Sequence, residues 1–165
     1  MGRPQRIEPG PGQESVWDYP RPPRVEPSTR HAEVVVGGVT VADSRRTVRV
    51  LETSGAPCYY FPPADVRMDL LSRTPSSTVC EWKGLAAYFD VAAGAVTAAD
   101  AAWSYPSPGD AYAELTGWIA FYPGRVEACF LDGERVEPQP GGFYGGWMTK
   151  DIVGPVKGGP GTERW

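Results

Sequence analysis

Glycine and proline interrupt this chain so often that turns and extended segments are favoured over long helices. The two residue types occupy 20 and 18 of 165 positions and concentrate at the two ends; their typical combined share is about 12%. Hydrophobic residues still make up 41% of the chain and aromatic residues 12%, which is enough to bury an interior. The length allows one compact domain of about 100–150 residues with tails.

The net charge and the cysteine content indicate which cellular compartment and which partners to expect. The net charge of -4 lacks the positive excess that drives binding to phosphate backbones, so no nucleic-acid partner is expected. The N-terminus has no apolar signal region, and no stretch approaches the ~20 apolar residues of a membrane span. We therefore expect a cytoplasmic protein without a membrane partner. Its three cysteines, Cys58, Cys80 and Cys129, are expected to be free thiols.

Short β-branched and aromatic runs predict a mainly β fold of antiparallel hairpins. Residues 32–36 and 39–43 flank Gly37-Gly38, which is the pattern of a tight hairpin. A second hairpin is predicted from 47–51 and 58–61. Further strands are predicted at 77–82, 85–91 and 95–103, a short helix at 106–115, and a last hairpin from 118–122 and 126–131, extended at 135–137.

The segment from Asp65 to Asp69 alternates charged and apolar residues, which favours a strand with one wet face. In such a strand Asp65, Arg67 and Asp69 share a face, where they either pair with one another or hold a metal beside a basic group. Internal ion pairing is the simpler interpretation.

The two ends of the chain differ in their aromatic content. Residues 1–30 predict a proline-rich, extended arm, followed by a β domain over 31–137. Residues 138–165 are rich in glycine and proline but carry aromatic side chains, which disordered segments usually lack. We expect this tail to pack on its own domain or on a second protomer, as in a homodimer.

Five motifs occur in an order that resembles a bacterial protein family. They are GGVTVADS at 37–44, YYFPPADVRMDLL at 59–71, TVCEWKG at 78–84, AWSYP at 102–106 and GWIAFY at 117–122. Over residues 32–131 the chain resembles the domain of unknown function 427 (DUF427, also labelled NTP_transf_9). The resemblance implies a small β-tent (Mss4-like) fold, similar to methionine sulfoxide reductase B and the cereblon ligand-binding domain, and no established activity.

The label of that family suggests nucleotidyl transfer, which the residues do not favour. Such chemistry needs carboxylates converging on magnesium, yet the usual Gly-Ser followed by Asp-x-Asp is absent. Related β-tent proteins carry zinc on Cys-x-x-Cys pairs; this chain has none, and its one histidine is His31. We expect neither a metal nor another cofactor.

Cys80 is the cysteine to weigh as a nucleophile. In a strand, Cys80 and Trp82 share one face and Lys83 lies on the other, so Lys83 does not necessarily activate the thiol. Free cysteines are also among the residues most often buried in cores. A catalytic Cys80 and a structural Cys80 both remain open, whereas Cys58 and Cys129 favour a core position.

Aromatic and charged side chains gather in the part of the sequence with most motifs. Tryptophan clusters fill a core or line a small-molecule pocket, and Gly84, next to Lys83, would permit close approach of a ligand or of another backbone segment. The candidate ligand-binding residues are Tyr59, Arg67, Asp69, Trp82, Lys83, Trp103 and Tyr105.

Three functions follow from these patterns. The first is binding of a small, anionic or nucleotide-like ligand by the aromatic and basic residues. The second is a thiol-dependent redox enzyme that uses Cys80. The third is a noncatalytic interaction module that works through the arm and the tail.

Overall fold

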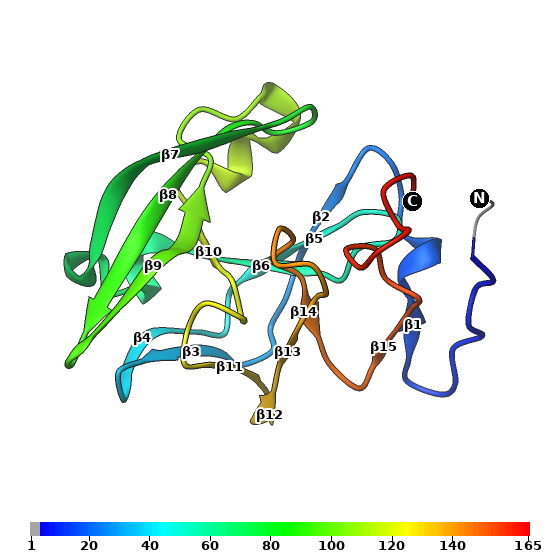
Figure 1. Cartoon of the computed structure of the whole chain (residues 1–165), viewed down its shortest axis with the longest axis horizontal. Coiled ribbons are helices and arrows are strands. Elements are labelled where there is room, and N and C mark those ends of the chain that lie inside the picture. The colour runs from blue at the N-terminus through cyan, green and yellow to red at the C-terminus, as the bar shows by residue number, and fades with distance from the viewer. Residues whose placement is uncertain (1–3) are drawn as a thin grey trace.

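Two antiparallel sheets, one of seven strands and one of four, form the framework of residues 4–165, which the computed structural model describes (Figure 1). The sequence-based prediction of a mainly β, antiparallel fold is confirmed. The larger sheet has the order β2 (Arg24–Pro27), β5 (Val48–Leu51), β6 (Cys58–Phe61), β10 (Ile119–Phe121), β9 (Val96–Ser104), β8 (Gly84–Ala93) and β7 (Leu71–Cys80).

The smaller sheet is built on the hairpin that the two glycines predict. Its order is β12 (Glu134–Arg135), β11 (Ala128–Leu131), β3 (Ala32–Val36) and β4 (Val39–Ser44). Gly37 and Gly38 both have positive φ, at 57° and 76°, as the tight turn requires. A Cβ atom on Gly37 would lie 2.1 Å from the Ala93 carbonyl oxygen, so this turn also fits closely against the β8–β9 turn.

Short elements complete the structure and bring the two ends of the chain together. β1 (Glu14–Ser15) pairs in parallel with β15 (Ile152–Val153), and β13 (Glu137–Pro138) pairs with β14 (Trp147–Met148). In Figure 1 the orange and red C-terminal part lies beside the blue N-terminal part. The helices are short 3₁₀ turns, η1 (Val16–Asp18), η2 (Pro63–Asp65), η3 (Met68–Leu70) and η4 (Asp110–Leu115).

The predicted hairpin of 118–122 with 126–131 is wrong. β10 pairs on both sides within the large sheet, with Ala120 opposite Tyr60 of β6 and Trp103 of β9, while β11 pairs with β3 and β12 in the small sheet. Both edges of β10 are therefore occupied, and the turn at Pro123-Gly124 carries the chain from one sheet to the other.

The predicted strand at 65–69 is also wrong. η2 and η3 occupy this segment, because Pro63 fixes φ at the start of a helical turn, and only Val66 forms an isolated bridge to Ala42. The predicted helix at 106–115 is reduced to η4, since Pro106 and Pro108 precede its first turn.

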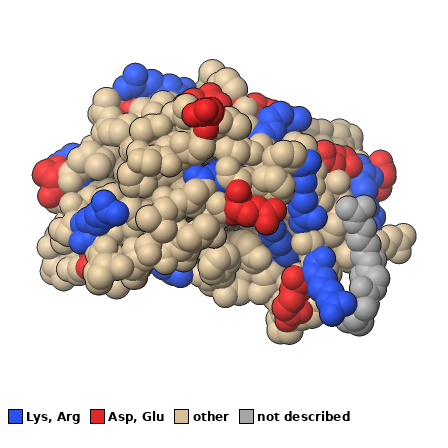
Figure 2. All heavy atoms as spheres, turned by 90° about the horizontal axis from the view of Figure 1, so that it is seen from above, with Lys and Arg blue, Asp and Glu red and all other residues tan. Residues whose placement is uncertain are grey.

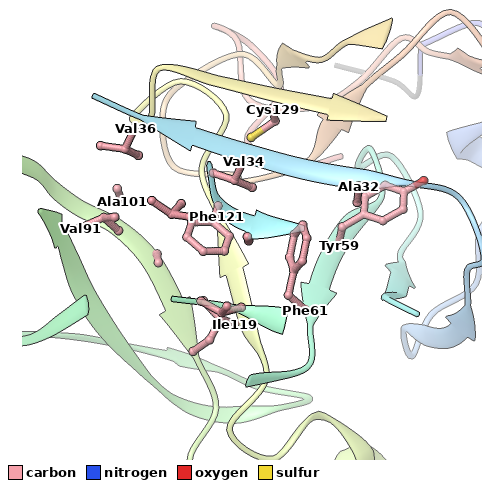
Figure 3. Packing of buried hydrophobic residues seen from close by; sticks show 14 of the residues in the cluster. Ala32, Val34, Val36, Tyr59, Phe61, Val91, Ala101, Ile119, Phe121 and Cys129 are labelled. Atoms are coloured by element: carbon pink, nitrogen blue, oxygen red, sulfur yellow. The ribbon is translucent and has the colours of Figure 1, made fainter. Parts of the chain in front are cut away.

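The main core lies between the two sheets. Phe61 of β6 and Phe121 of β10 pack edge to face with ring centroids 5.7 Å apart, and Val34 of β3 covers them from the small sheet (Figure 3). Trp147 of β14 enters the same core, with 1% of its surface exposed, and its indole N–H donates to the Phe121 carbonyl oxygen at 3.2 Å. The C-terminal part of the chain thus contributes a side chain to the central core.

Trp147→Ala should lower the free energy of unfolding by about 3–5 kcal/mol, because it empties a buried aromatic site. Urea denaturation followed by circular dichroism measures this change. The matched control is Phe143→Ala, since Phe143 is 62% exposed and its removal should change stability by less than about 0.5 kcal/mol. Equal stabilities of wild type and Trp147→Ala would contradict the placement of Trp147 in the core.

Candidate functional site

A pocket of about 210 Å³ lies on the face of the large sheet that is turned away from the main core. Alternation along β6 separates the two faces: Tyr59 and Phe61 enter the main core, whereas Cys58 and Tyr60 line the pocket. Trp103 on β9 and Thr78 on β7 face the same space. One strand pattern therefore supplies both the core and the pocket wall.

Aromatic rings form most of the pocket wall, and hydrogen bonds hold several of them. The Trp103 indole N–H donates to the Tyr60 hydroxyl at 3.0 Å, and the Trp103 and Tyr122 ring centroids are 4.5 Å apart. Burial raises the pKa of Tyr60, Tyr105 and Tyr122 above the ordinary value for tyrosine. Their hydroxyls therefore stay neutral at physiological pH and can act as donors.

Lys83 brings a positive charge to this aromatic wall. It stands in the turn between β7 and β8, is only 7% exposed, and lines the pocket. Its ammonium nitrogen lies 5.7 Å from the Tyr105 ring centroid. The side chain of Lys83 makes no hydrogen bond or ion pair with residues 4–165, which is unusual for a lysine buried to this extent.

Gly84 is suited to this turn because of its backbone conformation, since an added side-chain atom would not collide with its neighbours. Its φ of +96° is one that side-chain-bearing residues rarely adopt, whereas an added Cβ would meet only the Ser107 carbonyl oxygen at an ordinary 3.7 Å. Gly84 therefore orients the Lys83 turn, and the nearest neighbouring atom to an added Cβ is a backbone oxygen, that of Ser107.

Lys157 places a second ammonium group at the pocket from the C-terminal part of the chain. Its backbone N–H donates to the Ser54 carbonyl oxygen at 2.9 Å, and its own carbonyl accepts from Gln139 at 2.9 Å. The side-chain nitrogen lies 4.9 Å from the Tyr144 ring centroid. Glu52 is the carboxylate that lines the same pocket, and it pairs with Arg21 at 3.8 Å.

The structure brings together four of the residues selected from sequence and separates the others. Cys80, Lys83, Trp103 and Tyr105 all line the pocket. Trp82 packs on the aromatic cluster behind the pocket without lining it.

The remaining three selected residues lie elsewhere. Tyr59 is on the other face of the sheet, with its ring centroid 4.9 Å from that of Trp147. Arg67 and Asp69 form an exposed ion pair with each other at 3.0 Å. Asp65, which was expected on the same strand face, instead accepts hydrogen bonds from Arg46 and Ser44.

Several pocket residues were not selected from sequence. Tyr60 shares a face of β6 with Cys58, because residues two apart lie on the same side of a strand, but the burial of Phe61 in the main core is what shows that this face lines the pocket. Lys157 carries a compositional signal: the chain has 13 arginines but only three lysines, and two of these lysines, Lys83 and Lys157, line the pocket. The other unselected lining residues include Glu52, Tyr88, Tyr122, Gln139 and Tyr144.

The cysteines divide between pocket and core. Cys58 and Cys80 line the pocket, whereas Cys129 is buried between the sheets. Burial raises the pKa of the Cys58 thiol from its ordinary value of 9.0 to about 11. Cys58 is therefore a neutral thiol at physiological pH.

One group with metal-ligand side chains occurs in residues 4–165, away from the pocket. Potential ligand atoms of His31, Glu33 and Asp43 all lie within 4.8 Å of one another. The His31 Nε2 is hydrogen bonded to Asp43 at 2.8 Å, so internal pairing accounts for this group. It sits on the β3–β4 hairpin, on the smaller sheet.

The surface carries both signs of charge. Figure 2 shows basic and acidic side chains interspersed on one face, with wide areas of other residues between them. Within residues 4–165, no helix has the length and apolar character needed to cross a membrane.

Comparison with protein families decides the relationship that the motifs suggested. The family model described as a domain of unknown function (DUF427) matches residues 24–132, well over half of the chain. This chain belongs to the DUF427 family. No curated protein is similar enough to count as a match. The DUF427 region contains every strand of the large sheet and Lys83, whereas Gln139, Tyr144 and Lys157 lie beyond it.

Cys58 should react slowly with iodoacetamide at neutral pH. A pKa of about 11 lowers its thiolate fraction about a hundredfold relative to a thiol at 9.0, and the rate should rise as pH approaches 11. Peptide mass spectrometry of the Cys80→Ser, Cys129→Ser variant measures the rate. A rate equal to that of glutathione at neutral pH would contradict the environment described for Cys58.

Proposed function

We propose that this DUF427 protein binds a small anionic ligand in the pocket beside Lys83. The observation that carries the proposal is a lysine that is almost fully buried and has no carboxylate partner within residues 4–165. A buried ammonium group without a counter-ion is costly, so proteins normally pair or solvate it. An anion in the pocket would supply the missing partner.

The shape and lining of the pocket favour a ligand with one ring. The volume of about 210 Å³ is below the ~300 Å³ at which pockets for drug-sized ligands begin. Tyr60, Trp103 and Tyr105 offer flat apolar surfaces against which a ring can pack. A single aromatic or heteroaromatic ring with an acidic substituent fits these features better than a nucleoside triphosphate.

Isothermal titration calorimetry with benzoate tests this function, with benzyl alcohol as the neutral probe of similar size. Benzoate should bind, benzyl alcohol should bind at least about tenfold more weakly, and Lys83→Met should reduce benzoate affinity at least about tenfold. The charge at Lys83 is the physical reason for both differences.

The matched control is Lys150→Met, since Lys150 is exposed and is not among the residues that line this pocket, and it should bind benzoate like the wild type. Unfolding midpoints of all three proteins establish that the variants are folded. Failure of the wild type to bind benzoate, or unchanged binding by folded Lys83→Met, would contradict the proposed function.

A thiol-dependent redox activity is the second candidate, because Cys80 and Cys58 line the same pocket. It requires a Cys80 thiolate that forms readily at neutral pH. Iodoacetamide labelling of Cys80 in a Cys58→Ser, Cys129→Ser variant separates the two candidates. Labelling faster than that of glutathione would support the redox function, and labelling at or below that rate would oppose it.

Association through the C-terminal tail stays a prediction. Comparing the solution mass of the full chain with that of Trp147→Ala, which disturbs the docking of this tail, would test it.

A further inference from the structure

The pocket is completed by a segment that lies beyond the DUF427 region. We call residues 139–158 the C-terminal wall, because Gln139, Tyr144, Gly145 and Lys157 from this segment line the pocket opposite the sheet. Arg125 attaches it to the sheet: the guanidinium donates to the Gly142 carbonyl oxygen at 2.9 Å and stacks 3.9 Å from the Tyr122 ring centroid.

Gln139 fixes the position of this wall. Its side chain is 3% exposed; the oxygen accepts from the Ala56 backbone N–H at 3.0 Å, and the nitrogen donates to the Lys157 carbonyl at 2.9 Å. One buried amide group therefore joins the loop after β5 to the residue that carries the second ammonium group.

Glycines bring the wall into contact that larger residues would prevent. A Cβ atom on Gly145 would lie 2.2 Å from the Trp103 ring, and one on Gly158 would lie 1.9 Å from the Pro140 carbonyl oxygen. These approaches are shorter than real Cβ contacts, so glycine is required at both positions. Gly145 thus lets the C-terminal wall contact the Trp103 ring of the pocket, and Gly158 lets two parts of the wall contact each other.

The wall doubles the positive charge at the pocket. Burial lowers the pKa of Lys157, and repulsion from Arg21 and Lys83 acts in the same direction, while Glu52 opposes it. Glu52 is already paired with Arg21. Two ammonium groups, Lys83 and Lys157, therefore line one small pocket, and Glu52 is the one carboxylate among the residues of 4–165 that line it.

We propose that the C-terminal wall makes the pocket selective for aromatic dianions, of which an aryl phosphate monoester is the simplest chemical class. Lys83 binds the anionic group, and Lys157 adds the charge that distinguishes two negative charges from one. This inference rests on the proposed function, because it assigns the ligand class of the same pocket. Lys157 is the residue that determines specificity.

The test compares phenyl phosphate with its methyl ester, methyl phenyl phosphate, by isothermal titration calorimetry. Near pH 8 the monoester is a dianion, because its second pKa is about 6, whereas the diester carries one charge. The wild type should bind the dianion at least about tenfold more tightly. Lys157→Met should lose most of this preference: its affinity for the dianion should fall at least about tenfold, and its affinity for the singly charged diester should fall by a smaller factor, because Lys83 still supplies one positive charge.

Retained binding of the diester by Lys157→Met, with an unfolding midpoint close to that of the wild type, shows that the pocket of this variant is intact, and Lys150→Met should keep the full preference. Equal binding of both probes by the wild type, the full preference retained in Lys157→Met, or loss of both probes in Lys157→Met would overturn the selectivity. Benzoate binding that depends on Lys83 would then still support the proposed function. Failure of the wild type to bind benzoate or either phosphate would overturn both.

Discussion

The edge-to-face contact between Phe61 and Phe121 joins the neighbouring strands β6 and β10 of the large sheet and lies in the core that this sheet shares with the small sheet. Because side chains alternate along a strand, this contact also determines what the opposite face presents. Once Phe61 enters the core, Tyr60 must point the other way, where it accepts a hydrogen bond from Trp103 in the pocket wall. The part of the pocket wall that β6 supplies is therefore a consequence of how the core is packed.

The C-terminal part of the chain connects the core with the pocket. Trp147 anchors it in the main core through ring contacts with Tyr59 and Phe61 and a hydrogen bond to Phe121. A few residues earlier, Gly145 rests on the Trp103 ring, and Gln139 holds the Lys157 backbone. Gln139, Gly145, Trp147 and Lys157 lie beyond residues 24–132, which the DUF427 model matches, so the pocket of this chain combines the sheet of the matched region with a wall from outside it.

Local chemistry made most strands of this fold predictable. The Gly37-Gly38 turn specifies its hairpin because only a backbone with positive φ closes it, and the β-branched residues on either side favour extended structure. The separation of β10 from β11 was not predictable in the same way, because which strand edges are already occupied depends on residues far apart in sequence. At 65–69 the alternating pattern is typical of a strand, but Pro63 starts a helical turn and overrides it.

The candidate site was predictable only in part for the same reason. Lys83, Trp103 and Tyr105 are near motifs that mark the family, whereas Lys157 reaches the pocket only through tertiary packing. The sequence analysis placed Tyr59 at the ligand site, whereas Tyr60 lines the pocket. Consecutive residues of β6 face opposite sides of the sheet, and the burial of Phe61 determines which side each of them faces.

Arginines and lysines contact different groups in this structure, and this difference explains why the charge at the pocket has no partner. Arginines supply most of the ion pairs in residues 4–165, including Arg6 with Asp18, Arg30 with Asp132 and Arg46 with Asp65, where a planar fork matches a carboxylate. Lys83 and Lys157 instead lie over tyrosine rings and make no such pair. An ammonium group is a compact charge on a flexible stem, so it can adjust to an anion that arrives from solvent. The chain thus uses arginines for ion pairs on its own surface and places two of its three lysines at a pocket where they have no carboxylate partner within residues 4–165.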